Sequence, residues 1–253
     1  MVRFGIMNQN IGKILALVPA KAASKRIPRK NLRRLGGKSL LSWTVQVAVA
    51  AKIFDKIVVS TEDMEVAEEA QSLGAEVPFI RPEKLSVDPA GVVEVSLHAL
   101  NELETQGYCF QTLVILLPSS PFRSVFDIHT SLKCYSKIEA DFLMSVTKFE
   151  HSPFSALKLD RKGILTPLHP EWIEQLGAKE RPEVMPYFVK CNGAITIADV
   201  EQFKREKRYY VQPLAAYEMP WTRGLDIDTE QDIALGEFLL EKSLISEKDL
   251  FTL

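Results

Sequence analysis

Residues 14–31 read ILALVPAKAASKRIPRKN, and this segment sets the interpretation of the rest of the chain. Residues 14–18 form a short apolar run bounded by Lys13 and Pro19, which predicts a buried β-strand. Directly behind it, small residues alternate with positive charges, namely Lys21, Lys25, Arg26, Arg29 and Lys30. A buried strand followed at once by a basic loop suggests an anion site at the carboxyl end of a sheet.

Beyond this strand, short apolar runs alternate with amphipathic segments. The apolar runs predict strands at residues 14–18, 56–60, 76–80, 112–117, 142–146 and 194–198. The amphipathic segments predict helices at residues 40–51, 64–73, 92–104, 125–137 and 229–242. Strands that alternate with helices of this length form βαβ units. We therefore expect an α/β fold with a mostly parallel sheet and helices on both faces.

The 253 residues are long enough for a single large domain, which we expect to span residues 1–253. Residues 148–188 interrupt the pattern, because they are rich in Pro, Lys and Glu with scattered aromatic residues. We expect this segment to be an insertion that covers the site or pairs with another subunit. The tail from Ser243 onward is expected to be loosely attached.

The overall composition limits the kinds of partner. The formal net charge is -2, so the basic cluster is local and favours a compact anion over nucleic acid. Cys109, Cys134 and Cys191 lie far apart without metal-ligand spacing, which is typical of reduced thiols in the cytoplasm. Residues 1–13 are too short and too polar for a signal peptide or a membrane span, so we expect no membrane contact and a cytoplasmic location.

The basic loop admits two interpretations. It lacks the glycine patterns of a Walker A loop and of a Rossmann fingerprint. Its small residues would let backbone N–H groups approach a phosphate while Lys and Arg neutralise the charge. The alternative is a solvated charged loop or a nuclear import signal, which KRIPRKNLRR at residues 25–34 could mimic. The position behind a buried strand favours phosphate binding.

A second motif, GLDIDT at residues 224–229, carries a pair of carboxylates. Asp226 and Asp228 alternate in an extended segment, so their side chains point the same way and suit Mg²⁺. The alternative is that Asp228 or Thr229 only caps the helix that follows. Together with a polycationic loop, the pair suggests a site for a metal-bound nucleotide.

A third motif, LPSSPFR at residues 117–123, combines two prolines with hydroxyl and guanidinium groups. Ser119, Ser120 and Arg123 carry the groups that bind a sugar or a carboxylate. The alternative is a helix start with Ser124 as its cap. Residues 81–88 are a fourth candidate, for which an ordinary surface turn is the alternative.

Taken together, these segments resemble the CMP-sialic acid synthetase family, the cytidylyltransferases that activate nine-carbon acidic sugars. The matching segments follow the family's order and are VPAKAASKRIPRKN, FDKIVVSTED, RPEKL followed by Asp88, LLPSSPFR, NGAITI and DIDTEQD. The resemblance implies a Rossmann-like nucleotide-sugar transferase fold, CTP and an acidic sugar as substrates, and one or two Mg²⁺ ions as cofactor. It also implies a homodimer, with residues 148–188 as the dimerisation insertion.

The resemblance further implies roles for individual residues. The nucleotide-binding residues would be Lys21, Ser24, Lys25, Asn31, Arg81 and Ala90, with Lys21 and Lys25 on the triphosphate. The residues facing the sugar acid would be Ser119, Ser120, Arg123, Lys190 and Asn192. Asp226 and Asp228 would hold the metal, and the catalytic residues would be Lys21, Lys25 and Asp226.

Several positions depart from the family's pattern. Ala22 and Ala23 stand where the family usually has a small polar pair before the Ser. Lys21 stands where the family usually has Arg, which keeps the charge but loses the bidentate fork. Leu117 stands where the family usually has Gln, so a donor and an acceptor for the sugar are missing. The expected reaction joins CTP to a sialic, legionaminic or pseudaminic type of acid and yields CMP-sugar and pyrophosphate. A Kdo-type cytidylyltransferase and an inactive nucleotide-binding homologue are the alternatives.

Overall fold

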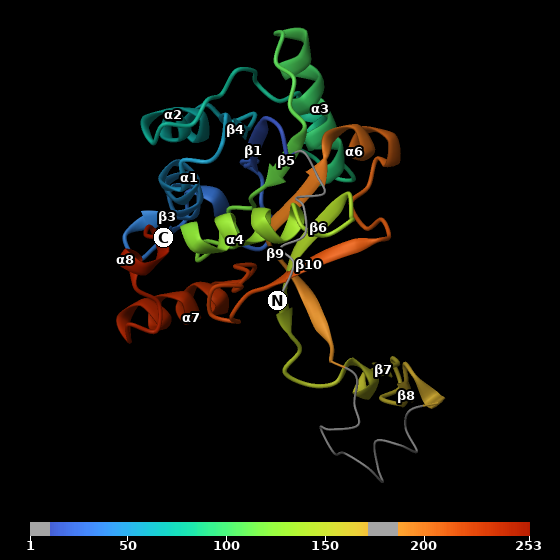
Figure 1. The fold of residues 1–253 in the computed structure, drawn as a ribbon. Helices are drawn as coiled ribbons and strands as arrows, with labels where there is room; N and C mark the ends of the chain where they lie inside the picture. The colour runs from blue at the N-terminus through green and yellow to red at the C-terminus, as the bar shows by residue number, and fades with distance from the viewer. Residues whose placement is uncertain (1–10, 172–186) are drawn as a thin grey trace, which may run out of the picture.

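A central sheet organises the part of the chain that the computed structural model describes, residues 11–171 and 187–253. The strand order is β10-β6-β9-β5-β1-β4 (Figure 1). The strands are β1 (Ile14–Pro19), β4 (Lys56–Ser60), β5 (Thr112–Ile115), β6 (Phe142–Lys148), β9 (Val189–Asp199) and β10 (Leu214–Glu218). β9 is antiparallel to β5 and β6, while the other neighbouring pairs are parallel. The prediction of a mostly parallel sheet is confirmed.

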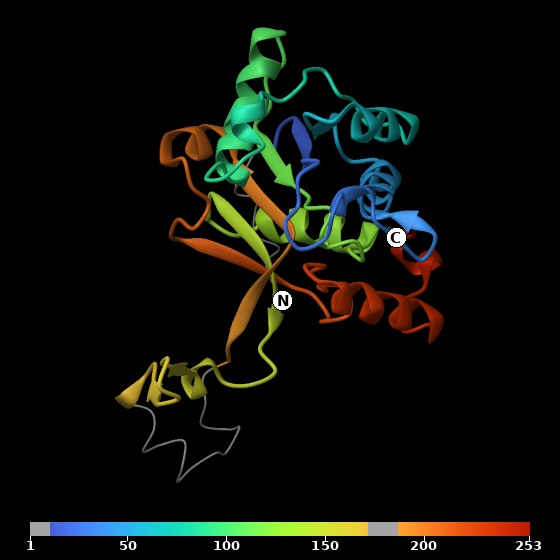
Figure 2. The same cartoon turned by 180° about the vertical axis from the view of Figure 1, so that it is seen from behind.

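Helices cover both faces of this sheet, as Figures 1 and 2 show from opposite sides. The helices are α1 (Leu40–Ala51), α2 (Met64–Ser72), α3 (Val92–Thr105), α4 (Val125–Tyr135), α6 (Val200–Glu206), α7 (Glu230–Glu241) and α8 (Glu247–Leu250). Ala16 and Val18 of β1 pack in the core with α1, α2 and α4, whereas Leu15 and Leu17 pack with α3 and α6. Alternate strand residues point to opposite faces, so β1 is buried on both sides, as its apolar run predicts.

Capping residues mark several of the predicted helix starts. The Ser39 side chain accepts the backbone N–H of Ser42 at the start of α1. Ser124 caps α4 and Thr229 caps α7, each through a reciprocal capping box. The cap alternatives for Ser124 and Thr229 are therefore confirmed, and Asp228 is left without a capping role.

Two expectations about the fold are wrong. Residues 76–80 form no strand, and only an isolated bridge joins Val58 to Glu76. Pro78 within that run has no N–H to give to a ladder. The tail from Ser243 is firmly packed, because Ile245 and Leu250 are buried in a core cluster and the Phe251 ring stacks on Trp43 at 6.1 Å. Figure 1 accordingly shows the C-terminus beside β3 (Lys38–Ser39).

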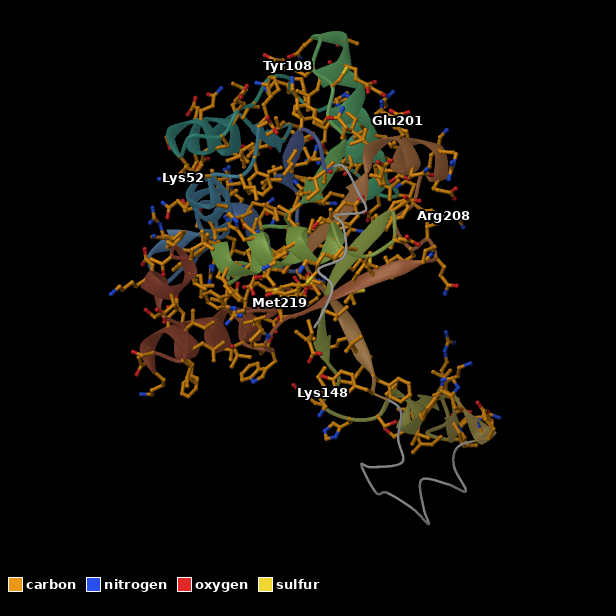
Figure 3. The ribbon with its side chains drawn as sticks, viewed as in Figure 1. Lys52, Tyr108, Lys148, Glu201, Arg208 and Met219 are labelled. Atoms are coloured by element: carbon orange, nitrogen blue, oxygen red, sulfur yellow. The ribbon has the colours of Figure 1, made fainter. Side chains whose placement is uncertain are left out.

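Between β6 and β9 the chain leaves the sheet and forms a projecting arm, which we define as residues 149–171 and 187–188 (Figures 1 and 2). Lys148 marks the point of departure from β6 (Figure 3). The arm carries a hairpin of β7 (Leu157–Leu159) and β8 (Leu165–Pro167). Residues 172–186 of the expected insertion lie outside the described residues.

The remaining elements are short. A small hairpin of β2 (Arg34–Leu35) and β3 precedes α1, and three 3-10 turns lie at Lys30–Leu32, Glu83–Leu85 and Pro153–Ser155. Cys109, Cys134 and Cys191 are free thiols, as expected. Within residues 11–171 and 187–253, no helix combines the length and the apolar character that a membrane crossing requires.

Candidate active site

Two loops at the carboxyl ends of neighbouring parallel strands border a cavity of about 610 Å³, here called the larger cavity. The loop after β1 is the basic loop, residues 20–31, and the loop after β5 is the 117–124 segment. Residues 86–88, which precede α3, also contribute to the wall. Of the predicted site residues, Lys21, Ser24, Lys25, Asn31 and Ser119 line this cavity.

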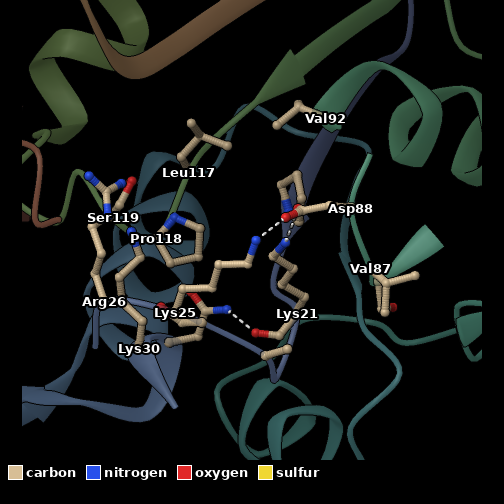
Figure 4. A pocket seen from close by; sticks show the side chains of 15 residues that line it. Lys21, Lys25, Arg26, Lys30, Val87, Asp88, Val92, Leu117, Pro118 and Ser119 are labelled. Carbon is tan, nitrogen blue, oxygen red and sulfur yellow. Dashed lines mark hydrogen bonds and ion pairs between the residues drawn. The ribbon is translucent and has the colours of Figure 1, made fainter. Parts of the chain in front are cut away.

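Four cations of the basic loop border the larger cavity, namely Lys21, Lys25, Arg26 and Lys30. Figure 4 shows Lys21 and Lys25 reaching toward Asp88. Lys25 Nζ lies 2.5 Å from one Asp88 carboxylate oxygen, and Lys21 Nζ lies 3.9 Å from the other. The hydrogen bond raises the pKa of Lys25 and lowers the pKa of Asp88. Exposed pairs of this kind are weak, so an anionic ligand can replace Asp88 on both lysines.

A second layer of contacts holds the backbone of the basic loop. The Glu62 carboxylate accepts the Ala22 N–H at 2.8 Å and the Arg81 guanidinium at 2.7 Å. Desolvation alone would raise the pKa of Glu62, but the hydrogen bonds from Arg81 and Ala22 outweigh it and lower the pKa. The Asn31 amide donates to the Lys21 carbonyl at 2.7 Å. The loop is therefore held in place while its cations face the cavity.

Arg81 and Ala90 do not reach the larger cavity in the way expected of nucleotide-binding residues. The Arg81 side chain is 2% exposed and bound to Glu62, beneath the basic loop. Ala90 lies between Asp88 and Val92, which do line the cavity, but it is not part of the lining itself. Arg81 and Ala90 were expected near the cytidine, and the structure places the Arg81 side chain as a support for the basic loop.

A smaller cavity of about 230 Å³ adjoins the larger one, because Val92 and Leu117 belong to both walls. Asn192 on β9 and Asp226 also line it. Its apolar wall residues are Ile115, Leu117, Met144 and Ile195. Two ligands placed in the two cavities would therefore meet beside Leu117.

The carboxylates of Asp226 and Asp228 have different surroundings. Asp226 is open to solvent on its cavity side. Desolvation by the surrounding protein raises its pKa, a hydrogen bond from Ser119 opposes the shift, and the charge of Asp228 adds to it. Asp228 instead pairs with Arg26 at 2.7 Å and with Lys30 at 3.1 Å. These ion pairs join the basic loop to the DxD segment, by which we mean residues 226–228 with the carboxylates of Asp226 and Asp228.

Asp226 and Asp228 are the residues that would hold a divalent cation. Within residues 11–171 and 187–253, no group of three or more His, Cys, Asp or Glu is placed to hold a metal ion. Mg²⁺ commonly binds one or two carboxylates and takes its other ligands from water and substrate phosphates. A cation would also relieve the repulsion between the two carboxylates. The donor set therefore fits Mg²⁺ bound together with a phosphate ligand.

The 117–124 segment directs most of its polar groups inward. The buried Ser120 hydroxyl donates to the Asn192 carbonyl at 3.1 Å. Arg123 is fully buried, and it donates to the Thr44 hydroxyl at 3.1 Å and to the Leu117 carbonyl. Burial lowers the pKa of Arg123 to about 9. Ser120 and Arg123 were expected to face the sugar acid, whereas the structure turns both side chains inward, where they shape the loop.

Asn192 and Lys190 lie on β9 but differ in position. Asn192 Oδ1 accepts the Ser145 hydroxyl at 2.5 Å and the Ala194 N–H at 3.1 Å. Its Nδ2 is buried and has no hydrogen-bond partner among the described residues, which leaves a donor beside the smaller cavity. Lys190 is exposed, with Nζ 6.0 Å from the centre of the Phe149 ring at the base of the arm, and it lines neither cavity.

Sequence reasoning missed Tyr209 and Tyr210, which line the smaller cavity. A hydrogen bond with Cys191, together with desolvation, raises the pKa of Tyr210 to about 12. The two tyrosines follow α6 and precede β10, and neither element is in the predicted set. Without those elements, no sequence signal places residues 209 and 210 near the site.

Residues 15–159, more than half of the chain, match the family model described as Cytidylyltransferase. The chain belongs to the cytidylyltransferase family. The family predicted from the motifs is thereby confirmed, and this cytidylyltransferase is an enzyme of the nucleotidyltransferase class.

Curated relatives extend the similarity over most of this cytidylyltransferase. It is 33% identical over 232 residues to the CMP-N,N'-diacetyllegionaminic acid synthase of Legionella pneumophila, covering 90% of this chain and 97% of that protein. It is 27% identical over 227 residues to a pseudaminic acid cytidylyltransferase of Campylobacter jejuni, with 90% and 96% covered. It is 30% identical over 240 residues to the N-acylneuraminate cytidylyltransferase of Escherichia coli, covering 94% of this chain and 55% of that longer protein.

The fold also occurs among solved structures. The structure of CMP:2-keto-3-deoxy-manno-octonic acid synthetase complexed with CTP superposes with a TM-score of 0.66 at 13% identity. The match covers 91% of this chain and 99% of that one. At this identity the likeness concerns the fold, and it agrees with the predicted α/β architecture.

Proposed function

We propose that this cytidylyltransferase transfers the CMP group of CTP to the anomeric hydroxyl of a nine-carbon α-keto acid sugar. The observation that carries the proposal is the pair of adjoining cavities, one bordered by four cations and the other by Asp226 and Asn192. The relatives named for legionaminic, pseudaminic and N-acylneuraminic acids support the class of sugar.

In this proposal CTP occupies the larger cavity. Lys21 and Lys25 exchange Asp88 for the triphosphate, and Ser24 contributes a hydroxyl. Asn31 and the backbone near Ala90 lie close to the cytidine, as the resemblance implies. The two lysines then neutralise the charge that develops on the leaving pyrophosphate, which is the main demand of phosphoryl transfer.

The sugar acid occupies the smaller cavity. Its anomeric oxygen attacks the α-phosphorus of CTP, a new O–P bond forms, and the bond to pyrophosphate breaks. Asp226 stands on this wall and accepts the proton of the hydroxyl. A divalent cation held by Asp226 and Asp228 would neutralise phosphate oxygens during transfer. Asn192 Nδ2 and Ser119 are the polar groups that orient the two substrates.

The wall of the smaller cavity bears on which sugar fits. Leu117 supplies no hydrogen bond where the family usually has an amide, and Ile115 and Met144 extend the apolar surface. Such a wall favours acyl methyl groups over hydroxyls, because a buried hydroxyl without a partner is costly. We therefore rank a diacetylated acid of the legionaminic or pseudaminic type above N-acetylneuraminic acid.

The test is pyrophosphate release from CTP and Mg²⁺ with N-acetylneuraminic, legionaminic, pseudaminic and Kdo acids side by side. Turnover with a nine-carbon acid is expected, and turnover with Kdo alone would replace the proposal by the Kdo-type alternative. Asp228→Ala is expected to lower turnover by about 10³-fold, because it removes one of two metal-binding carboxylates. Glu230→Ala, which removes only an exposed pair with Arg33, is the matched control. CTP binding without turnover by any acid would favour the inactive homologue.

We also propose a homodimer in which the arm contacts the second subunit, and a cytoplasmic location where CTP is available. The support is the run of exposed apolar side chains on the arm, namely Leu157, Leu159, Ile164, Leu165 and Leu168. Exposed apolar groups gathered on one projection are typical of an interface. Light scattering of the wild type and of Leu159→Ser tests this, with a dimer expected for the first and more monomer for the second.

A further inference from the structure

A buried carboxylate outside both cavities receives an unusual number of hydrogen bonds. Asp127 on α4 is fully buried. Its two oxygens accept Arg223 Nε at 2.8 Å and Arg223 Nη2 at 3.0 Å, which is a bidentate ion pair. They also accept the Tyr217 hydroxyl at 2.8 Å, and the Ser124 N–H and hydroxyl at 2.9 and 2.8 Å. Asp127 thus ties the start of α4 to the end of β10 and to the loop that follows.

The loop that Arg223 anchors is the one that carries the DxD carboxylates. Arg223 stands three positions before Asp226. At Gly224 the chain runs so close to its neighbours that an added Cβ would lie 2.5 Å from Thr147 Cγ2 and 2.7 Å from Asn192 Nδ2. The Ile227 N–H then donates to the Ser119 carbonyl at 2.7 Å. The segment 223–228 is therefore held at three points, two before Asp226 and one after it.

The charges around Asp127 also bear on the role of Arg223. Arg123 is fully buried, and the carboxylates that favour its charged form are Asp127 and Asp226. Arg223 pairs with Asp127, and its side chain remains partly exposed. A purely packing role would place an apolar side chain here, whereas the planar guanidinium fixes both a distance and an angle.

We propose that Arg223, held by Asp127, is a positioning residue that sets where Asp226 and Asp228 stand relative to the two substrates. The inference rests on the proposed cytidylyltransfer. It assigns Arg223 no contact with substrate, since the guanidinium is bound to Asp127. A small displacement of a reacting group is expected to cost rate far more than it costs binding of CTP, whose cationic site lies on the basic loop.

The experiment compares Arg223→Met and Arg223→Lys with the wild type, and uses Arg205→Met as the control. Arg205 is an exposed arginine paired with Glu206 on the surface. We expect Arg223→Met to lower kcat by about 10²-fold with the KM for CTP unchanged, and to raise the Mg²⁺ concentration that gives half activity. Arg223→Lys should recover only part of kcat, because an ammonium keeps the charge but cannot form the bidentate pair. Arg205→Met should change neither quantity.

A readout that does not depend on activity is hydrogen exchange at the Ile227 amide, which donates to Ser119. Arg223→Met should speed this exchange, while the Leu32 amide, which directly follows the basic loop and donates to the Arg29 carbonyl, keeps its wild-type rate. Gly224→Ala, which displaces the same segment from the other side, should reproduce both effects if Arg223→Met folds poorly. A lower melting temperature with unchanged kcat and unchanged Ile227 exchange would overturn the proposal. Wild-type protein without turnover would remove the proposed function, while the exchange measurement would still decide whether Arg223 orders the segment.

Discussion

The basic loop and the 117–124 segment follow the neighbouring strands β1 and β5 and both carry cationic and hydroxyl side chains, yet they direct them oppositely. In the basic loop, Lys21 and Lys25 face the larger cavity. In the 117–124 segment, Ser120 and Arg123 are fully buried and bind backbone carbonyls. The two loops carry similar residue types. Whether such a side chain can bind a ligand or only shapes its loop therefore depends on whether it is buried.

The neighbouring residues account for the contrast. In the 117–124 segment, Phe122 is fully buried and packs edge-on against Trp43, with ring centroids 5.9 Å apart, which draws Arg123 into the interior beside it. The first half of the basic loop has Ala22 and Ala23, which bury little surface, and its backbone is held by the polar groups of Glu62 and Asn31 instead. Because Glu62 and Asn31 hold the loop through its backbone, the side chains of Lys21 and Lys25 remain on the cavity side.

The largest effect on stability is expected from Glu62→Gln, which removes the carboxylate that supports the basic loop. The buried Arg81 loses its carboxylate, so the free energy of unfolding should fall by about 3 kcal/mol. Because the folded-state pKa of Glu62 is lowered, its stabilising contribution is present above the unfolded pKa and is lost as pH falls through the folded pKa. Urea unfolding at neutral and at acidic pH measures both. Glu65→Gln, in an exposed pair with Arg29, is the control, and equal losses for the two variants would contradict the account.

Arg123→Met is expected to lower the stability of the fold without changing the affinity for CTP. The variant leaves the Thr44 hydroxyl and the Leu117 carbonyl without the guanidinium donor, so unfolding should become easier by about 2 kcal/mol. Calorimetric titration should give an unchanged affinity for CTP. A weaker affinity for CTP or a raised KM for the sugar with normal stability would mean that Arg123 reaches a ligand after all.

Lys25→Met should behave in the opposite way. The side chain is 88% exposed and pairs with Asp88, so its loss should leave the melting temperature unchanged. Loss of a charge-assisted contact with the triphosphate should weaken CTP binding about tenfold. Lys242→Met, an exposed lysine paired with Glu241, is the matched control. A lower melting temperature for Lys25→Met with unchanged affinity for CTP would mean that Lys25 stabilises the fold and does not bind the triphosphate.

The smallest effect is expected from Leu117→Gln, at the boundary between the two cavities. An amide there adds a donor and an acceptor, so the ratio of kcat/KM between N-acetylneuraminic and diacetylated acids should shift several-fold, up to about 10-fold. Initial rates with the two acids measure that ratio, and Val92→Leu, an apolar change on the same shared wall, is the comparison. An identical ratio in Leu117→Gln and wild type would show that residue 117 does not read the sugar.

Much of the architecture and part of the site could be predicted from local pattern. The helix at residues 40–51 and the strand at residues 56–60 coincide with α1 and β4, because capping and apolar periodicity are properties of adjacent residues. Lys21, Lys25, Asn31 and Asp226 line the cavities as the motifs indicated. β10 and the tyrosines before it escaped notice, because the LAAYE run at residues 214–218 has weak strand propensity and is ordered by pairing with β6.

Local sequence alone therefore determined most of the strands, the basic loop and the pair of carboxylates at Asp226 and Asp228, since each depends on neighbours along the chain. Only the tertiary structure decided the direction in which each side chain points. Arg81 and Arg123 are internal supports because their hydrogen-bond acceptors, Glu62 for Arg81 and Thr44 for Arg123, are distant in sequence but lie beside them in the fold. It also brought Asp228 to the basic loop through Arg26 and Lys30. Burial and long-range pairing depend on how the sheet folds, and no window of adjacent residues contains that information.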